Sequence, residues 1–418
     1  MAQLKDDCFA FDGQLMPLTD ALAVLAERLG PVMGTEEVPL RRGLERILGE
    51  DVIAERDVPP HDNSAVDGYA VFFDDLEADG ETRLAVTGRL AAGHPLDRAA
   101  RRGEALRIFT GAPMPDGPDT IFMEEDCRAE GDYVVLPAGL ARGANRRKAG
   151  EDITSGTTIA RAGYRLRPQE IGAAASVGRS RLAVYRRLRA AVFSTGDEVR
   201  DPRQGAPDGC IFDANRYTVM GLLEGLGCEV TDLGILPDDL DAIGAALDAA
   251  AGGHDLLITS GGVSAGEEDH VKDAVEALGQ IHFWRLAIKP GRPIVLGQVG
   301  ETAFVGLPGN PVAAMVTFMV IARPVVLLLA GCTDVVASRF PVRAGFDCEK
   351  KQGRREWARV RIETDSKGEP VAMKYRSDGA GILTSMVEAD GLVELPEDMS
   401  KLAEGATVDF LPFSEVMR

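Results

Sequence analysis

Two glycine-rich segments contain residue types that bind phosphate or another oxyanion. Glycine lets the backbone approach a ligand closely, and free N–H groups at the start of a following helix attract an anion. We therefore predict that the two segments form an anion-binding cradle, although each alone also has the form of an ordinary strand-to-helix turn. The segments are Thr259–Gly266 and Gly306–Pro311, and the residues expected at the ligand are Gly261, Gly262, Ser264, Pro308, Gly309 and Pro311.

Three acidic clusters follow predicted strands, at Asp197–Glu198, Asp238–Asp239 and Glu267–Asp269. Taken singly, each cluster could simply complement the dipole of the helix that it starts. Three clusters at one edge of a sheet place carboxylates together. Mg²⁺ is held in this way, by one or two carboxylates and a substrate phosphate. The sequence therefore indicates a magnesium site there, and which carboxylate binds metal and which orients water stays open.

Two groups of cations stand against the acidic composition. Lys289 and Arg292 flank a Pro-Gly turn, which holds the two side chains in place. Arg146 and Arg147 begin a short basic run. Runs of charge are usually solvated surface, but the Lys289/Arg292 pair is predicted to bind anionic oxygens, and Arg146 and Arg147 are predicted to bind the anionic substrate as well.

A competing pattern is the G-x-S-x-G of serine hydrolases, present at residues 262–266. Such an enzyme also needs an acid and a later histidine. The histidines that follow, His270 and His282, fall in a helix and its next strand. A double glycine also interrupts the expected run from strand to serine, so we interpret this match as chance.

Strands and helices alternate between residues 187 and 330, which predicts a doubly wound parallel sheet covered on both faces. Ligands of such sheets bind beyond the carboxyl ends of the strands, where the glycine segments and acids fall. Short alternating strands before and after this region predict two small β domains. The apolar run at residues 312–330 contains Arg323 and Pro324, so it is predicted to be a buried helix rather than a membrane span.

The formal net charge is −20, which disfavours nucleic acid and anionic membranes as partners. The six cysteines are scattered without a CxxC pair, as in a reduced cytoplasmic protein, and argue against structural zinc. The first residues lack the basic start and apolar core of a signal peptide. We therefore expect a cytoplasmic location.

Seven motifs occur in an order that resembles the molybdopterin molybdenumtransferases, the MoeA and gephyrin E-domain family. Each motif is weak alone, but the ordered set is specific and spans the chain from about residue 17. The motifs are Asp62–Ala70, Arg107–Pro113, Gly150–Asp152, Phe193–Glu198, Ser260–Asp269, Ile288–Pro293 and Gly306–Pro311.

The resemblance implies a four-domain homodimer of α/β class. Its implied domains are a discontinuous mixed N-terminal domain at 1–53 and 154–186, an inserted β-rich domain at 54–153, a MogA-like doubly wound domain at 187–330 and a C-terminal β-barrel at 331–418. It also implies the reaction, in which adenylated molybdopterin and molybdate give the molybdenum cofactor and AMP with Mg²⁺ present. The residues carried over as catalytic are Asp67, Thr110, Glu198, Asp238 and Asp269. Of these, Glu198, Asp238 and Asp269 are the expected metal ligands.

The chain departs from the family at five positions. A third basic residue is usual at Ala149, lysine at Arg285 and Arg292, and serine at Ala313 and Ala380. These changes leave open the choice between molybdate and tungstate. Two other functions stay as alternatives: nucleotide transfer of the molybdopterin adenylyltransferase type, and a non-catalytic dimeric scaffold. The adenylyltransferase is also a candidate partner.

Overall fold

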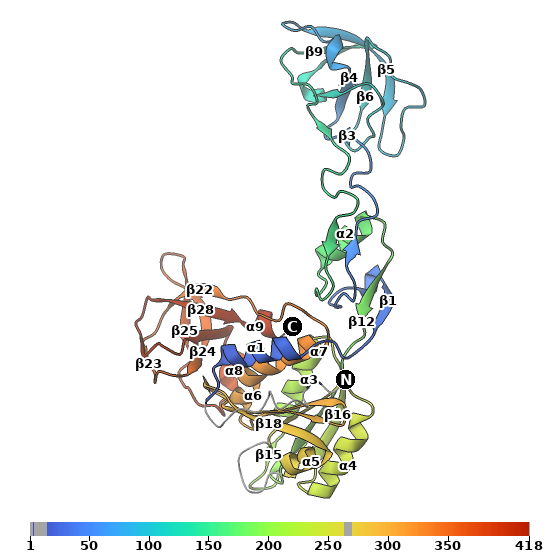
Figure 1. Ribbon diagram of the computed structural model, residues 1–418. Helices are drawn as coiled ribbons and strands as arrows, with labels where there is room; N and C mark the ends of the chain where they lie inside the picture. Colours follow the sequence, from blue (N-terminus) through green and yellow to red (C-terminus); the bar gives the residue numbers. More distant parts are fainter. Residues whose placement is uncertain (1–2, 4–14, 263–269, 418) are drawn as a thin grey trace.

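The computed structural model describes residue 3 and residues 15–262 and 270–417. Figure 1 shows an elongated molecule with a β-rich body at one end and two packed bodies at the other. Extended chain segments and a small mixed unit join the two ends. This shape separates residues of the inserted body from the rest of the chain.

A six-stranded sheet forms the centre of the α/β body, in the order β16-β13-β17-β21-β20-β18. Strands β16, β13, β17 and β21 run parallel, as predicted. Strand β20 is antiparallel to both neighbours, because only residues 300–301 separate it from β21 and so short a link makes a hairpin. The strands are β13 (Arg189–Thr195), β16 (Glu229–Leu236), β17 (Leu256–Ser260), β18 (Gly279–Arg285), β20 (Pro293–Val299) and β21 (Thr302–Leu307).

Helices cover both faces of this sheet, which confirms the doubly wound prediction. Successive residues of β13 belong to opposite cores: Val192 packs with α3 and α6, whereas Phe193 packs with α4 and α5. The alternation follows from the two-residue period of a strand and explains why the strands are apolar throughout. The helices are α3 (Asn215–Gly225), α4 (Leu240–Ala251), α5 (His270–Leu278) and α6 (Pro311–Thr317).

Helix α6 continues through a π-helical stretch, η5 (Phe318–Ala322), into α7 (Arg323–Leu329). Pro324 cannot donate a backbone hydrogen bond, and the wider turn before it accommodates this loss. By length and composition Pro311–Leu329 is apolar enough to cross a membrane, and the whole of its most apolar window is buried inside the fold. The prediction of a buried helix is confirmed.

A six-stranded sheet, β7-β4-β6-β5-β9-β8, makes up the inserted body. Two small cores lie on its opposite sides. Its strands are β4 (Gly68–Val71), β5 (Thr82–Leu90), β6 (Glu104–Ile108), β7 (Thr120–Met123), β8 (Arg128–Glu130) and β9 (Tyr133–Leu136); single-turn helices η3 (Phe73–Asp75) and η4 (Glu124–Asp126) and the ladder of β3 (Asn63–Ser64) with β10 (Arg146–Arg147) complete it.

The small mixed unit pairs chain segments from either side of the insertion. It contains β1 (Thr35–Pro39), η2 (Leu40–Arg42), β2 (Val52–Ile53), β11 (Thr158–Ala160), α2 (Pro168–Ser176) and β12 (Arg181–Tyr185). Helix α1 (Leu18–Arg28) packs elsewhere. Its buried Leu18 and Leu25 join the core of the α/β body beside α7, although α1 lies in the predicted 1–53 segment.

The C-terminal strands close into a five-stranded barrel, since β24 pairs with both β25 and β26. This confirms the predicted β-barrel. Its elements are β22 (Phe340–Ala344), β24 (Arg355–Thr364), β25 (Pro370–Lys374), β26 (Gly391–Leu395) and β28 (Thr407–Pro412), with β23 (Cys348–Glu349), β27 (Lys401–Leu402), α8 (Thr384–Glu388) and α9 (Phe413–Val416) outside the closed ring. Strand β19 (Ile288–Lys289) of the α/β body pairs with β24 and joins the two bodies.

Candidate active site

A cavity of about 290 Å³ lies at the carboxyl ends of the parallel strands, where the sequence places the ligand. We call it the glycine-loop cavity. Both predicted glycine segments reach it, together with two of the predicted acids. The predicted residues that line it are Gly261, Gly262, Gly309, Pro311, Glu198 and Asp238.

The glycine loops need their glycines for steric reasons. Gly261 and Gly262 have positive φ angles of 94° and 64°. A Cβ atom at Gly262 would lie 2.5 Å from the Thr195 hydroxyl, and one at Gly309 would lie 3.7 Å from the Gly261 Cα. The loops therefore touch each other and the end of β13. Pro308 is buried behind the cavity, where its carbonyl accepts a hydrogen bond from Ser260 Oγ at 2.9 Å.

Glu198 and Asp238 are exposed and face this cavity from the ends of two neighbouring parallel strands. Neighbouring Asp239 has a structural role, because its side chain caps α4 by accepting the Ala242 N–H at 2.8 Å. Ser264 and Asp269 lie outside the described residues. Within the described residues, no three acidic, histidine or cysteine side chains gather closely enough to hold a metal ion by themselves.

The two histidines of the hydrolase alternative are separated. His270, in the first turn of α5, lines the glycine-loop cavity. His282 is buried in β18. His270 is thus the one histidine of the described residues that lines the cavity. The sequence analysis placed it in a helix and gave it no role in the site.

A second cavity, of about 190 Å³, lies between the α/β body and the barrel. We call it the barrel cavity. Lys289 lines it and forms an ion pair with Glu356 at 3.1 Å, while Glu356 also binds Arg354 at 2.7 Å. Arg292 is exposed and lines neither cavity. The structure therefore separates the two cations that the sequence predicts as a pair.

Arg359 is the functional candidate that sequence analysis missed. It lines the barrel cavity, is 3% exposed, and forms no ion pair among the described residues. Its guanidinium donates to neutral oxygens: Ser385 Oγ at 3.1 Å, Ser377 O at 2.7 Å and Gly379 O at 3.3 Å. Burial lowers the pKa of Arg359 from its usual range. Asp378 lines the same cavity and its charge opposes that lowering, but it forms no ion pair with the guanidinium. A buried cation without a directly paired carboxylate suits an anionic ligand.

Helix α6 contributes Pro311 to the lining of the glycine-loop cavity and contacts two segments beside the barrel cavity. A Cβ atom at Gly291, two residues after Lys289, would lie 2.1 Å from the Thr317 hydroxyl, so the Lys289 turn packs against α6. At the other end of the helix, the Val312 N–H donates to Ala380 O at 2.9 Å. Ala380 follows the carbonyls that hold Arg359. The start of α6 thus contacts the loop beside one cavity while Pro311 lines the other.

Two of the departures from the family pattern, Ala313 and Ala380, therefore lie where this helix meets the barrel; Ala313 is 4% exposed. Arg285 is exposed at the end of β18. Ala149 donates its backbone N–H to Asp62 at 2.8 Å.

Asp67 and Thr110 are brought into contact although 43 positions separate them. The backbone N–H and the hydroxyl of Thr110 both donate to Asp67 Oδ1, each at 2.7 Å. These bonds lower the pKa of Asp67, first through the backbone and then through the side chain. The pair is exposed in the inserted body, at the end of the molecule away from the glycine-loop cavity (Figure 1). One chain therefore does not bring all predicted catalytic residues together.

Arg146 and Arg147 also lie in this body and differ in their surroundings. Arg146 is paired with Asp62, and the Ala149 N–H and Arg146 together lower the pKa of Asp62. Arg147 is exposed. Of the two, Arg147 is the cation left for a ligand.

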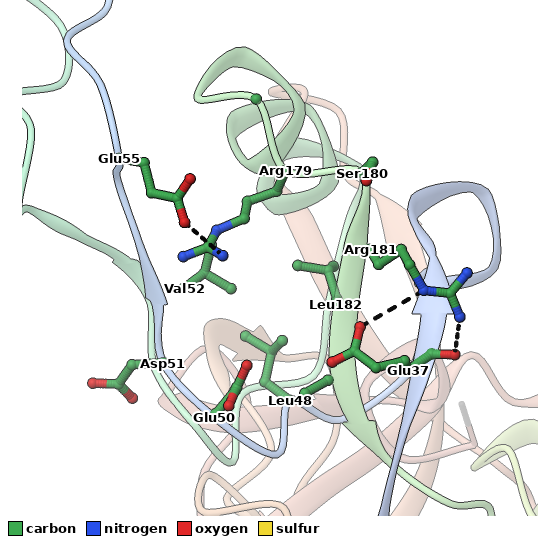
Figure 2. Close-up of a pocket in the computed structure, with 12 residues that line it drawn as sticks. Glu37, Leu48, Glu50, Asp51, Val52, Glu55, Arg179, Ser180, Arg181 and Leu182 are labelled. Atoms are coloured by element: carbon green, nitrogen blue, oxygen red, sulfur yellow. Dashed lines mark hydrogen bonds and ion pairs between the residues drawn. The ribbon is translucent and has the colours of Figure 1, made fainter.

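A third hollow, of about 320 Å³, lies in the mixed unit and is lined by none of the predicted residues. Figure 2 shows its two arginines already engaged by glutamates. Arg179 pairs with Glu55 at 2.9 Å, and Arg181 donates to the Glu37 carbonyl at 2.7 Å. This hollow is not part of the candidate site.

Comparison with known proteins decides the family. Residues 16–178 match the MoeA N-terminal region (domain I and II), residues 191–327 the probable molybdopterin binding domain, and residues 341–413 the MoeA C-terminal region (domain IV). The molybdopterin molybdenumtransferase of Haemophilus influenzae is 35% identical over 405 residues, covering 96% of this chain and 100% of that protein. The chain belongs to the MoeA family. The family predicted from the ordered motifs is confirmed, and the chain is a transferase of molybdenum cofactor biosynthesis.

Further relatives agree with this assignment. Molybdopterin molybdenumtransferase 2 of Mycobacterium tuberculosis is 33% identical and covers 88% of this chain and 92% of that protein. Two crystal structures of the MoeA protein from Pyrococcus horikoshii match 96% of this chain. One has a TM-score of 0.82 at 27% identity over 100% of its chain, and the other 0.76 at 31% over 99%. The MoeA fold therefore extends over nearly the whole chain.

Proposed function

We propose that this transferase binds adenylated molybdopterin in the glycine-loop cavity and replaces its AMP with molybdenum from molybdate. The observation that carries the proposal is that both glycine loops and two carboxylates, Glu198 and Asp238, line one cavity. Glycine loops at helix starts bind phosphate through backbone N–H groups. Carboxylates alone would repel a phosphate, so a cation is needed between them.

Mg²⁺ is the cation that fits. Glu198 and Asp238 provide two carboxylates, and the substrate provides phosphate oxygens, which together form the donor set that Mg²⁺ takes. Asp269 is proposed as a further ligand. When bound, Mg²⁺ would neutralise the charge that develops on the displaced phosphate. The residues of the chain hold the metal and the substrate at the carboxyl edge of the sheet.

Molybdate is proposed to bind in the barrel cavity. Arg359 offers it a buried positive charge that forms no ion pair among the described residues, although the Asp378 carboxylate lines the same cavity. Lys289 offers an ammonium group that is 43% exposed. A dianion there would share Lys289 with Glu356, which keeps its second partner Arg354. Since α6 lines the glycine-loop cavity and packs against the segments beside the barrel cavity, the oxyanion would lie on the far side of that helix start from the phosphate.

A homodimer is proposed because one chain holds Asp67 and Thr110 far from the glycine-loop cavity (Figure 1). In a two-fold dimer, the inserted body of one subunit can complete the site of the other. Each dimer would then contain two composite sites. Arg147 of the inserted body would add a cation to the partner's site.

A cytoplasmic location is part of the proposal. The five cysteines in the described part of the chain are free thiols, as reducing conditions require. Contact with the molybdopterin adenylyltransferase, which would supply the adenylated substrate, is also proposed.

The test is AMP release from adenylated molybdopterin by the purified protein with Mg²⁺ and varied molybdate. We expect release to depend on both ions and to fall at least about 100-fold in Asp238→Asn, because a metal ligand contributes several kcal/mol. Asp241→Asn is the matched control. Asp241 is exposed in the first turn of α4, outside the cavity, and its loss should leave the rate unchanged. AMP release without molybdate, or equal rates in both variants, would overturn the proposal.

A further inference from the structure

Asn215 joins the two glycine loops. It is the first residue of α3 and lines the glycine-loop cavity. Its amide nitrogen donates one hydrogen bond to Ser260 Oγ at 2.8 Å, at the end of β17, and a second to Gly309 O at 2.7 Å. A side-chain amide has two N–H hydrogens, and these two contacts use both. Asn215 therefore spans the gap between loops that lie about 50 positions apart in the chain.

Ser260 extends this connection. Its hydroxyl accepts from Asn215 and donates to Pro308 O at 2.9 Å, and Ser260 is 7% exposed. The Gly261 N–H adds a backbone bond to Leu307 O at 3.1 Å. Three side-chain bonds thus run in one network from α3 through β17 to the loop before α6. The Ser260–Pro308 bond is buried, the Asn215–Ser260 bond is partly buried and the Asn215–Gly309 bond is exposed. The buried bond restrains the loops more than an exposed bond would.

The next residue, Arg216, fixes the start of α3 from behind. Its side chain is fully buried and bonds three aspartates, Asp201, Asp213 and Asp232. Burial alone would lower the pKa of Arg216, but the three carboxylates raise it, so the guanidinium stays charged. An arginine held by three partners leaves the helix start little freedom to move. The Asn215 amide is therefore presented to the loops from a rigid support.

We infer that Asn215 is a positioning residue that holds the two glycine loops together so that both act on one phosphate of the substrate. The inference rests on the proposed binding of adenylated molybdopterin in this cavity. Gly261 and Gly262 have positive φ angles, and as glycines they can also adopt many other backbone conformations. The two bonds from Asn215 select the arrangement in which the loops touch. Asn215 itself takes no part in the reaction.

The experiment compares the dissociation constant of adenylated molybdopterin for four variants of the full-length protein. Asn215→Ala should raise it by about tenfold or more, since two hydrogen bonds are lost. Asn215→Asp should raise it further, because a carboxylate cannot donate and would face the oxygens of Ser260 and Gly309. Ser260→Ala should have an effect similar to Asn215→Ala. The double variant Asn215→Ala/Ser260→Ala should have a dissociation constant only slightly above that of Asn215→Ala, because the two residues act through one network.

Thr218→Ala is the matched control. Thr218 lies one turn along α3, outside the cavity, and loses a single hydrogen bond to Ala214 O at 3.0 Å. Its dissociation constant should equal the wild-type value. The thermal midpoint is measured for every variant, because a merely structural role would lower the midpoint and leave the affinity of the folded protein unchanged.

A lowered thermal midpoint with an unchanged dissociation constant would overturn the inference, and so would full independence of the Asn215 and Ser260 effects. Normal binding by the wild-type protein would in both cases preserve the proposed function. Wild-type protein that does not bind adenylated molybdopterin would overturn both.

Discussion

Replacing Arg359 by methionine tests whether the barrel cavity receives the oxyanion. Arg359 is 3% exposed, and three neutral oxygens accept hydrogen bonds from it at 2.7–3.3 Å. Methionine keeps much of the buried apolar contact and removes the charge and all five N–H donors. The substitution therefore removes an anion-binding group and leaves the barrel strand in place.

The magnitude follows from these contacts. A hydrogen bond to a charged partner contributes about 1.5–3 kcal/mol, which corresponds to a rise of roughly 10- to 150-fold in half-saturating molybdate. The effect on stability should be smaller, on the order of 1–2 kcal/mol. The loss of the three hydrogen bonds lowers the free energy of unfolding, whereas removing the buried charge raises it, so the two effects partly cancel. Arg359→Lys keeps the charge and should recover part of the affinity.

The assay is AMP release at saturating adenylated molybdopterin and Mg²⁺, titrated with molybdate. Arg361→Met is the matched control, since Arg361 lies two residues along β24 with its side chain exposed. We expect its half-saturating molybdate to equal the wild-type value. An unchanged value in well-folded Arg359→Met, or the same rise in Arg361→Met, would refute the assignment of the barrel cavity to the oxyanion.

Three further predictions follow from the structure. Lys289→Ala should raise half-saturating molybdate with little loss of thermal stability, because Glu356 keeps its bond to Arg354; an unchanged molybdate titration would contradict the role of Lys289. Asp67→Asn and Asp238→Asn chains, each inactive alone, should regain about a quarter of wild-type AMP release when co-expressed, because random pairing makes half the dimers mixed and each mixed dimer keeps one intact site. Purified mixed dimers with no activity would exclude the shared site. Burial alone would raise the pKa of Glu104, but hydrogen bonds from Arg98 and Thr87 lower it from 4.5 to about 2. Because the folded pKa is the lower one, about 3 kcal/mol of stability is present above pH 4.5 and is lost as the pH falls towards 2. Glu104→Gln should therefore lower the thermal midpoint at pH 7, with a difference from wild type that shrinks below pH 4.5; a difference independent of pH would exclude this role.

Much of the fold could be predicted from the sequence, because the deciding signals are local. The apolar run of Ala190–Ser194 indicates a strand buried on both faces, and β13 is one. Residues 312–330 indicate a buried helix because Arg323 and Pro324 interrupt them, and the helix lies in the core. Backbone period and capping depend on residues within a few positions of each other. The ordered motifs identify the family for the same reason, since each is a short stretch.

The direction of β20 follows from a connection too short for a crossover, which the alternation of helices and strands does not reveal. The glycine-loop cavity could be predicted only in outline. Sequence reasoning places Gly261, Gly309, Glu198 and Asp238 at one edge of a sheet, and the structure gathers them in one cavity.

The tertiary structure alone decided which side chains meet. Asn215 and Ser260 are 45 positions apart, so their contact has no local signal in the sequence. In the sequence of β24, nothing distinguishes Arg359 from the other charged residues of an alternating strand. Its burial depends on a loop that folds over it from residues 377–379. Lys289 and Arg292 are near neighbours in sequence, yet the one faces the barrel cavity and the other solvent. Local sequence sets backbone conformation and periodicity, whereas contacts between distant side chains arise only when the packed elements bring their surfaces together.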